Sequence, residues 1–219
     1  YLWVCYGAVH GPFPPAPRHL KEYPEAKVKV PADIYPPRIG KPKYSREKEQ
    51  WIRGENGLPV LKDKRFSGRT VSGKFIHGID LHSLERQYHQ GVLAIDEGVG
   101  KLIQALKDTG QYENTLIVFG ADQGIAWGQK GFQMKLAPYD GTIRGPLIVS
   151  MPKKFPSDKV CEKPVGGADL VPTFFKAASL ELPWKMRGRD LTPLLNKPED
   201  KSWQSPLLLA QTGMSFGED

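Results

Sequence analysis

The chain has 219 residues, of which 39% are hydrophobic, enough for a sizeable core, and no apolar run approaches the roughly 20 residues that span a bilayer. Its formal net charge of +7 favours anionic partners such as sulfated glycans, phosphate esters, nucleic acid or acidic membrane surfaces. The sequence has no zinc-finger spacing, RNP-type aromatic motif or basic helix, which argues against a nucleic-acid-binding protein.

An apolar run from Leu2 to Val9 predicts a buried strand at the start of the chain. The HGPFPPAPRH that follows contains prolines and a glycine that stop helix or sheet, so His10 is expected at a strand end. A histidine there is either a surface loop residue or part of a site. The run opens at Tyr1 without the basic segment and cleavage pattern of a signal peptide, so we expect the chain to begin inside a fold.

Residues 20–79 are rich in Pro, Lys, Glu and Gly and are expected to form an irregular excursion with one short helix near Ser45–Arg53. Their basic side chains either contact an anionic ligand or belong to a solvated loop. Cys5, in the first predicted strand, and Cys161, in a Lys-rich connection, do not favour a disulfide.

Apolar residues at three- and four-residue spacing predict a long helix from about Leu81 to Lys107. Asp80 can cap its start, and Gly110 can end it. Asp96 and Glu97 are adjacent on this helix and point about 100° apart, which argues against a paired catalytic role and favours salt bridges or solvent contact.

Two apolar stretches of strand length, Thr115–Phe119 and Leu147–Met151, enclose a polar loop. Asp122 and Gln123 follow the first of them. In an open α/β sheet, ligands bind at the carboxyl ends of the strands, where carboxylate and amide oxygens can hold a cation. The alternative is a turn that merely ends the strand, because Asp and Gly are turn formers.

The order of elements predicts an α/β protein in which the three strands lie in one mostly parallel sheet, with the long helix on one face. Further along the chain, Asp169 is expected to cap a helix, and Leu207–Ala210 to form one more strand.

Several segments together resemble the sulfatase family of the alkaline phosphatase superfamily: AVHGPF, the long helix leading through GQYENT into the strand before ADQG, WGQKGFQMKLAPYDGTIRGP, GADLVPTFF and MRGRDLTPLLN. The resemblance covers residues 1–13 and about 80–210. It implies the middle-to-late part of one alkaline-phosphatase-like catalytic domain, with a mostly parallel sheet flanked by helices and an irregular insertion at about 20–79.

The resemblance also implies roles for individual residues. His10 and Lys135 match positions that bind substrate, and both could stabilise charge on the sulfate ester or protonate its leaving oxygen. Asp122 and Gln123 match ligands of a divalent cation, usually calcium, which prefers oxygen donors. Lys130 stands where many relatives carry a histidine, and is either a substrate contact or a solvated lysine. Tyr139 and its neighbours match a stretch that supports the Lys135 loop.

Sulfatases use a formylglycine made from the Cys or Ser of a Cys-x-Pro/Ala-Ser-Arg motif, which this sequence lacks. Cys5 is followed by YGAV and Cys161 by EKPV, so neither can be the precursor. The family's amino-terminal pair of metal-binding aspartates is absent too. We therefore expect a fragment, with the formylglycine segment and a carboxy-terminal subdomain outside it, that alone binds calcium poorly and is inactive.

The implied function of the complete protein is hydrolysis of a sulfated carbohydrate or aryl sulfate in the periplasm, outside the cell or in a lysosome. A phosphodiesterase or phosphonate hydrolase of the same superfamily is one alternative, and a noncatalytic module that binds sulfated glycans is another. The expected partner is an anionic sulfated small molecule or glycan, with no nucleic acid and no membrane span. The oligomeric state is left open.

Overall fold

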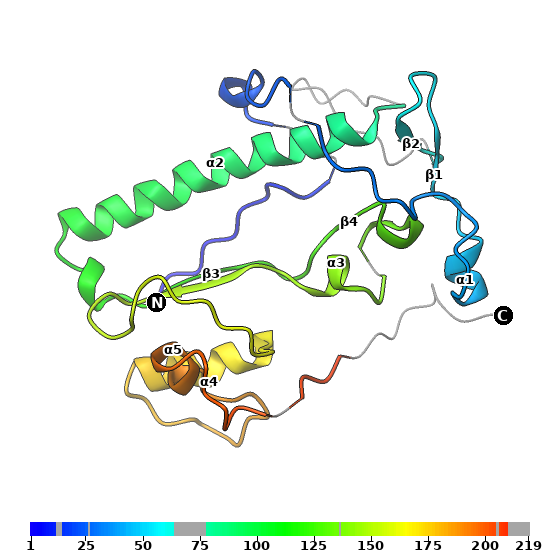
Figure 1. Cartoon of the computed structure of the whole chain (residues 1–219). Helices are drawn as coiled ribbons and strands as arrows, with labels where there is room; N and C mark the ends of the chain where they lie inside the picture. Colours follow the sequence, from blue (N-terminus) through cyan, green and yellow to red (C-terminus); the bar gives the residue numbers. More distant parts are fainter. Residues whose placement is uncertain (12–14, 26, 64–77, 136, 205, 210–219) are drawn as a thin grey trace. The chain divides into compact units, whose positions relative to one another are not determined.

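The computed structural model describes residues 1–11, 15–25, 27–63, 78–135, 137–204 and 206–209 (Figure 1). The described residues form two compact units. The first contains Tyr1–Ile103 and Gly124–Arg144, and the second contains residues 104–123 and 145–209. Of the sequence expectations, part of the irregular excursion, residues 64–77, and the last residue of the final strand, Ala210, lie outside the described residues.

Besides the elements treated below, the chain has short helical turns and one short helix, η1 (Pro17–His19), η3 (Tyr112–Asn114), η4 (Gln129–Gly131) and α3 (Asp140–Ile143). Within the described part of the chain, no helix is both long enough and apolar enough to cross a membrane.

The core of the first unit gathers around a two-stranded hairpin. Strands β1 (Trp51–Arg53) and β2 (Pro59–Leu61) pair antiparallel, with Trp51 opposite Leu61. The turn between them contains Gly57 at φ +78°, a left-handed conformation that glycine adopts without strain. The buried side chains of this core are those of Ile34, Trp51, Leu61, Leu81 and Leu84.

The helix predicted at Ser45–Arg53 is wrong in extent. Helix α1 covers only Lys43–Arg46, and the chain then enters β1. The reason is tertiary: Trp51, which is 1% exposed, must point into the core, and the hairpin turn pairs its strand with β2.

The predicted long helix is confirmed as α2 (Leu81–Asp108). The Asp80 carboxylate accepts hydrogen bonds from the Ser83 backbone N–H, at 3.1 Å, and from the Ser83 hydroxyl, at 3.0 Å, so Asp80 caps the helix as expected. Gly110 is left-handed, at φ +69°, and the N–H of Gln111 reaches back to the Leu106 carbonyl at 2.8 Å. The helix therefore ends in the way that the sequence predicts.

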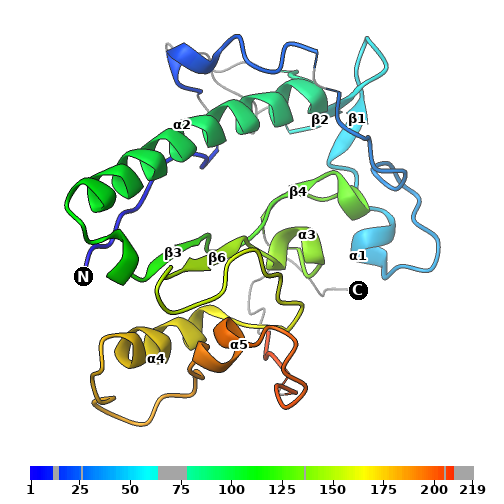
Figure 2. The same ribbon diagram turned by 60° about the vertical axis from the view of Figure 1, so that its left-hand side comes forward.

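The first nine residues run along α2 instead of forming a buried strand (Figures 1 and 2). Tyr6 packs over Gly98, and Val9 packs over Gly91, two helical turns apart. Residues 1–6 are exposed and belong to no strand. The predicted strand at Leu2–Val9 is wrong in this structure, because the segment lies against a helix and pairs with no strand among the described residues.

A polar stripe on α2 holds the segment that follows. Glu97 accepts a hydrogen bond from Arg18 Nε at 2.7 Å and lies 2.9 Å from His19 Nε2. The Gln90 amide donates to the Glu22 carbonyl at 2.8 Å. The salt-bridge role expected of Glu97 is confirmed.

The second unit is built on strands β3 (Ile117–Gly120) and β6 (Leu147–Ser150), which lie side by side in Figure 2. They pair antiparallel, with Ile117 opposite Ser150 and Gly120 opposite Leu147. The expectation that these strands run parallel is wrong. The chain leaves β3 and returns to β6 at the same end of the pair, a connection that produces antiparallel strands, whereas parallel strands need a crossover.

Two helices complete the second unit, α4 (Gly167–Ala177) and α5 (Thr192–Asn196). Leu191 and Leu194 are buried, at 2% and 3% exposure. Leu207–Leu209, part of the predicted last strand, is exposed and is not in a strand, so that expectation is wrong for the described residues.

Candidate functional site

Asp122 and Gln123 lie just beyond the end of β3. The N–H of Ala121 still reaches the Pro146 carbonyl at 3.3 Å, and the next two residues leave the strand pair. Asp122 is exposed and Gln123 is half-buried. Their side chains meet, because Gln123 Nε2 donates to Asp122 Oδ2 at 3.3 Å. The two predicted metal ligands are therefore neighbours in space as well as in sequence.

Gly124, the last residue of the triplet, is required by a close approach of two chain segments. A Cβ there would overlap the carbonyl oxygens of Gly141 and Arg144, and its N–H donates to the Thr142 carbonyl at 2.9 Å. The glycine is thus explained by backbone packing, and not by the turn that was the alternative interpretation.

The donor chemistry of the Asp122 and Gln123 pair suits a hard cation. A carboxylate and an amide oxygen are ligands that calcium accepts, whereas zinc and copper favour nitrogen or sulfur. The amide nitrogen of Gln123 faces the carboxylate, so a shared cation requires the amide to turn its oxygen inward. Among the described residues, no three or more His, Cys, Asp or Glu side chains gather to hold a metal. Metal binding by Asp122 and Gln123 stays a prediction.

Lys130 and Lys135 belong to a small hairpin in the first unit. Its strands, β4 (Ala126–Trp127) and β5 (Gln133–Met134), pair antiparallel, and Lys135 follows β5 directly. Four of its residues are left-handed: Gly128 at φ +93°, Lys130 at +54°, Gly131 at +77° and Met134 at +61°. For the two non-glycine residues this conformation costs on the order of 1–3 kcal/mol each, and it persists only where the surroundings fix it.

Lys130 is tied to Asp33, which no sequence pattern singles out. Its Nζ lies 3.0 Å from Asp33 Oδ2, and its backbone N–H donates to Asp33 Oδ1 at 3.2 Å. Burial would raise the pKa of Asp33, but the hydrogen bonds and charge of Lys130 outweigh it and hold that pKa below its ordinary value. Asp33 is therefore charged at neutral pH and compensates Lys130. Substrate binding by Lys130 stays a prediction.

Tyr139 packs against the same hairpin. Its ring lies 5.7 Å from that of Phe132, centroid to centroid, and its hydroxyl is 3.4 Å from Ser45 Oγ. The buried cluster there comprises Ala126, Phe132 and Ala137. The supporting role expected of Tyr139 agrees with these contacts.

His10 lies in a turn, with its N–H donating to the Gly7 carbonyl at 3.1 Å, and its side chain is exposed. His10, Lys130 and Lys135 belong to the first unit, and Asp122 and Gln123 to the second. Convergence of these residues on one cleft therefore stays a prediction.

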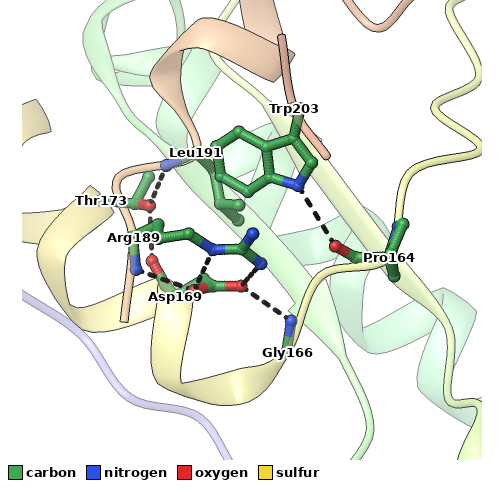
Figure 3. A network of polar contacts seen from close by, with 7 residues as sticks. All are labelled: Pro164, Gly166, Asp169, Thr173, Arg189, Leu191 and Trp203. Carbon is green, nitrogen blue, oxygen red and sulfur yellow. Dashed lines mark hydrogen bonds and ion pairs between the residues drawn. The ribbon is translucent and has the colours of Figure 1, made fainter. Parts of the chain in front are cut away.

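Asp169 has a structural role (Figure 3). It is the third residue of α4, whose N-cap is Gly166, and Oδ2 accepts the Gly166 N–H at 3.0 Å. Asp169 also receives the Arg189 backbone N–H at 2.8 Å and its guanidinium at 3.1 Å. The Arg189 guanidinium stacks 4.2 Å from the Trp203 ring centroid. The prediction of Asp169 as the N-cap residue is wrong in position, because the N-cap is Gly166 and Asp169 caps the helix from the third position of its first turn.

The thiols of Cys5 and Cys161 are free and exposed, so neither takes part in a disulfide. This agrees with the sequence interpretation.

Comparison with known proteins gives a consistent result. A family model described as Sulfatase matches residues 1–180. An N-acetylglucosamine-6-O-sulfatase from Bacteroides thetaiotaomicron is 28% identical over 228 aligned residues, which cover 86% of this chain and 40% of the relative.

Two solved structures share the fold. One, a protein in complex with its substrate D-glucosamine-2-N,6-O-disulfate, has a TM-score of 0.69 at 25% identity over 90% of this chain and 48% of its own. A phosphonate monoester hydrolase from Silicibacter pomeroyi has a TM-score of 0.63 at 27% identity over 87% of this chain and 36% of its own. The predicted partial α/β fold of the alkaline phosphatase type is confirmed, and this chain spans less than half the length of these proteins.

Proposed function

Because the chain belongs to the sulfatase family, we propose that it is part of a sulfatase that hydrolyses sulfate esters of a carbohydrate. The observation that carries this proposal is the family match over residues 1–180, which includes the Asp122 and Gln123 pair at the end of β3. In this proposal the 219 residues are one part of a single catalytic domain.

The family uses a formylglycine and a divalent cation. We propose calcium as the cation, with Asp122 and Gln123 supplying two of the six to eight oxygens that calcium takes, and with further ligands and the formylglycine outside this chain. When bound, the cation supplies positive charge beside the sulfate ester. Residues 1–219 alone are then expected to bind calcium weakly and to lack turnover, because the nucleophile is absent.

His10 and Lys135 are proposed to act on the substrate itself. Both can donate hydrogen bonds to the sulfate oxygens, and either can give a proton to the departing alkoxide, which carries negative charge as the S–O bond breaks. Lys130 is proposed as an outer substrate contact, with its charge balanced by Asp33.

The substrate proposed is a 6-O-sulfated amino sugar or a related sulfated glycan. Two similar proteins support it, one named for N-acetylglucosamine-6-O-sulfate and one solved with a disulfated glucosamine. We propose an extracellular, periplasmic or lysosomal location, because some similar proteins are named as extracellular sulfatases.

The test is turnover by the complete protein, assayed with 6-O-sulfated glucosamine, an aryl sulfate and a phosphonate monoester at equal concentration. We expect the highest kcat/KM for a sulfate ester. Preference for the phosphonate monoester would instead indicate that the complete protein is a phosphonate monoester hydrolase, like the similar enzyme from Silicibacter pomeroyi. Binding of sulfated glycans without turnover of any of the three would indicate a noncatalytic module.

A further inference from the structure

Residues 31–51, here called the platform, dock against the β4–β5 hairpin along its whole loop. Ile34 packs so closely against Gly128 that a Cβ on this glycine would overlap the Ile34 side chain. The Trp51 indole donates to the Phe132 carbonyl at 3.1 Å, and the Gln50 side chain accepts the Gln133 N–H at 2.9 Å. Together with the Asp33 bonds to Lys130, these contacts reach the hairpin loop from Gly128 to Gln133.

Arg38 organises the platform. It is 5% exposed, and its guanidinium donates at 2.5 to 2.8 Å to four backbone carbonyls, those of Asp33, Ile34, Ser45 and Lys48. One guanidinium thus links backbone carbonyls between residue 33 and residue 48 and holds this segment in a compact loop. Its planar group also forms the surface on which Gly131 rests, because a Cβ on Gly131 would overlap it.

Asp33 joins the platform to the hairpin. Its carbonyl accepts from Arg38, and its carboxylate accepts the backbone N–H and the ammonium of Lys130. Lys130 is one of two non-glycine left-handed residues in the hairpin, and the Asp33 bond to its N–H fixes that conformation.

We propose that Asp33 and Arg38 are positioning residues for the sulfatase reaction: they hold the hairpin loop in its left-handed conformation and so fix the location of Lys135, which acts on the substrate. The inference rests on the proposed function. It assigns to residues 31–51, within a segment that the sequence marks only as irregular, a defined task at the active site.

The first test uses two glycines in nearly the same backbone conformation, Gly131 at φ +77° and Gly57 at φ +78°. A Cβ on Gly57 meets nothing within 4 Å, whereas one on Gly131 meets Arg38. In the complete protein, Gly131→Ala is expected to lower kcat by ten- to a hundredfold, the loss typical of a misplaced catalytic group, and Gly57→Ala less than twofold.

The second test removes one carboxylate. Asp33→Ala is expected to lower kcat at least tenfold with little change in thermal midpoint, whereas Asp200→Ala, which removes a carboxylate with exposed hydrogen bonds to Ser202 outside the platform, leaves kcat unchanged. If Asp33 acts through Lys135, Asp33→Ala causes no further loss of kcat in a Lys135→Ala background. Additive losses in the double variant, or unchanged kcat in Asp33→Ala and Gly131→Ala, would overturn the inference.

Hydrogen exchange separates this inference from the proposed function. In the complete protein, amides of residues 128–135 are expected to exchange at least tenfold faster in Asp33→Ala and Gly131→Ala than in the wild type, with no change for Asp200→Ala. Unchanged exchange would overturn the positioning role even in an active enzyme. If the two variants exchange faster but the wild-type protein hydrolyses no sulfate ester, the conclusion that Asp33 and Arg38 hold the hairpin would stand. Only the sulfatase assignment would then be refuted.

Discussion

At the scale of single residues, Asp169 is the carboxylate on which the second unit depends most. Asp169 is only 4% exposed, so water cannot readily take its place. Asp169→Ala therefore leaves the Gly166 N–H and the Arg189 guanidinium without their acceptor. Because the Arg189 side chain is partly exposed, the main cost is that of leaving the backbone N–H groups bound by Asp169 without an acceptor, about 1–3 kcal/mol. We expect a loss of that size in the free energy of unfolding, measured in urea with the fluorescence of Trp203 and the other tryptophans.

Asp200→Ala is the matched control for Asp169→Ala. Asp200 also accepts local hydrogen bonds, from Ser202, but it is exposed. Its loss is expected to lower the free energy of unfolding much less than the loss of Asp169, because water replaces the exposed hydrogen bonds of this carboxylate. Equal costs for the two variants would show that the network in Figure 3 does not stabilise the second unit.

Glu85 gives the chain a pH-dependent stability near neutrality. Burial raises its pKa from 4.5 to about 7. Between these two values the folded chain binds a proton that the unfolded chain has released, so stability falls as pH rises from about 4.5 to 7 and stays lower above. Glu85→Gln is expected to remove this fall. Thermal midpoints measured from pH 4 to 8 test it, with the exposed Glu55→Gln as control; a fall that persists in Glu85→Gln would contradict the assignment.

At the scale of elements, Gly98 and Gly100 of α2 should respond differently to alanine. Alanine in a helix interior gains about 1 kcal/mol over glycine, and a Cβ on Gly100 meets nothing within 4 Å. On Gly98 it would lie 2.7 Å from the Tyr6 hydroxyl oxygen and 2.9 Å from Cε1. We expect Gly100→Ala to raise the free energy of unfolding. The value for Gly98→Ala should be about 1 kcal/mol lower than that for Gly100→Ala.

The Gly98 effect should depend on Tyr6. In a Tyr6→Ala background, Gly98→Ala and Gly100→Ala are expected to raise the thermal midpoint equally. A difference that survives removal of Tyr6 would show that the amino-terminal segment does not lie on this face of α2.

Elements that depend on local signals could be predicted from the sequence, and elements that depend on partners could not. Helix α2 has its periodicity, its Asp80 cap and its Gly110 stop, and was predicted to within a residue. The β1–β2 hairpin was missed although Asn56–Gly57 is a hairpin turn signal. The run Leu2–Val9 has the composition of a strand, but a strand also needs a neighbour to pair with, which composition cannot reveal.

At the scale of the whole molecule, the same division applies to the candidate site. Asp122 and Gln123 could be predicted because a β-branched run delivers them to a strand end. The roles of Asp33 and Arg38 could not be predicted, because their partners are backbone groups and a lysine that only folding brings near. Asp33 and Lys130 are nearly a hundred residues apart in the sequence. The parallel sheet was predicted from the order of the elements and the buried character of the strands, and neither of these fixes where the chain re-enters the β3–β6 pair.

The proposed cation site at the end of β3 predicts a direct relation between one carboxylate and activity. In the complete protein, Asp122→Ala is expected to lower both calcium affinity and kcat/KM for a sulfate ester at least about a hundredfold, because a ligand of the cation is lost. Asp108→Ala, which removes an exposed carboxylate bonded to Gln104, serves as control and should leave both unchanged. Calcium titration followed by turnover of the same preparations is the decisive measurement. Wild-type calcium affinity and activity in Asp122→Ala would contradict the site.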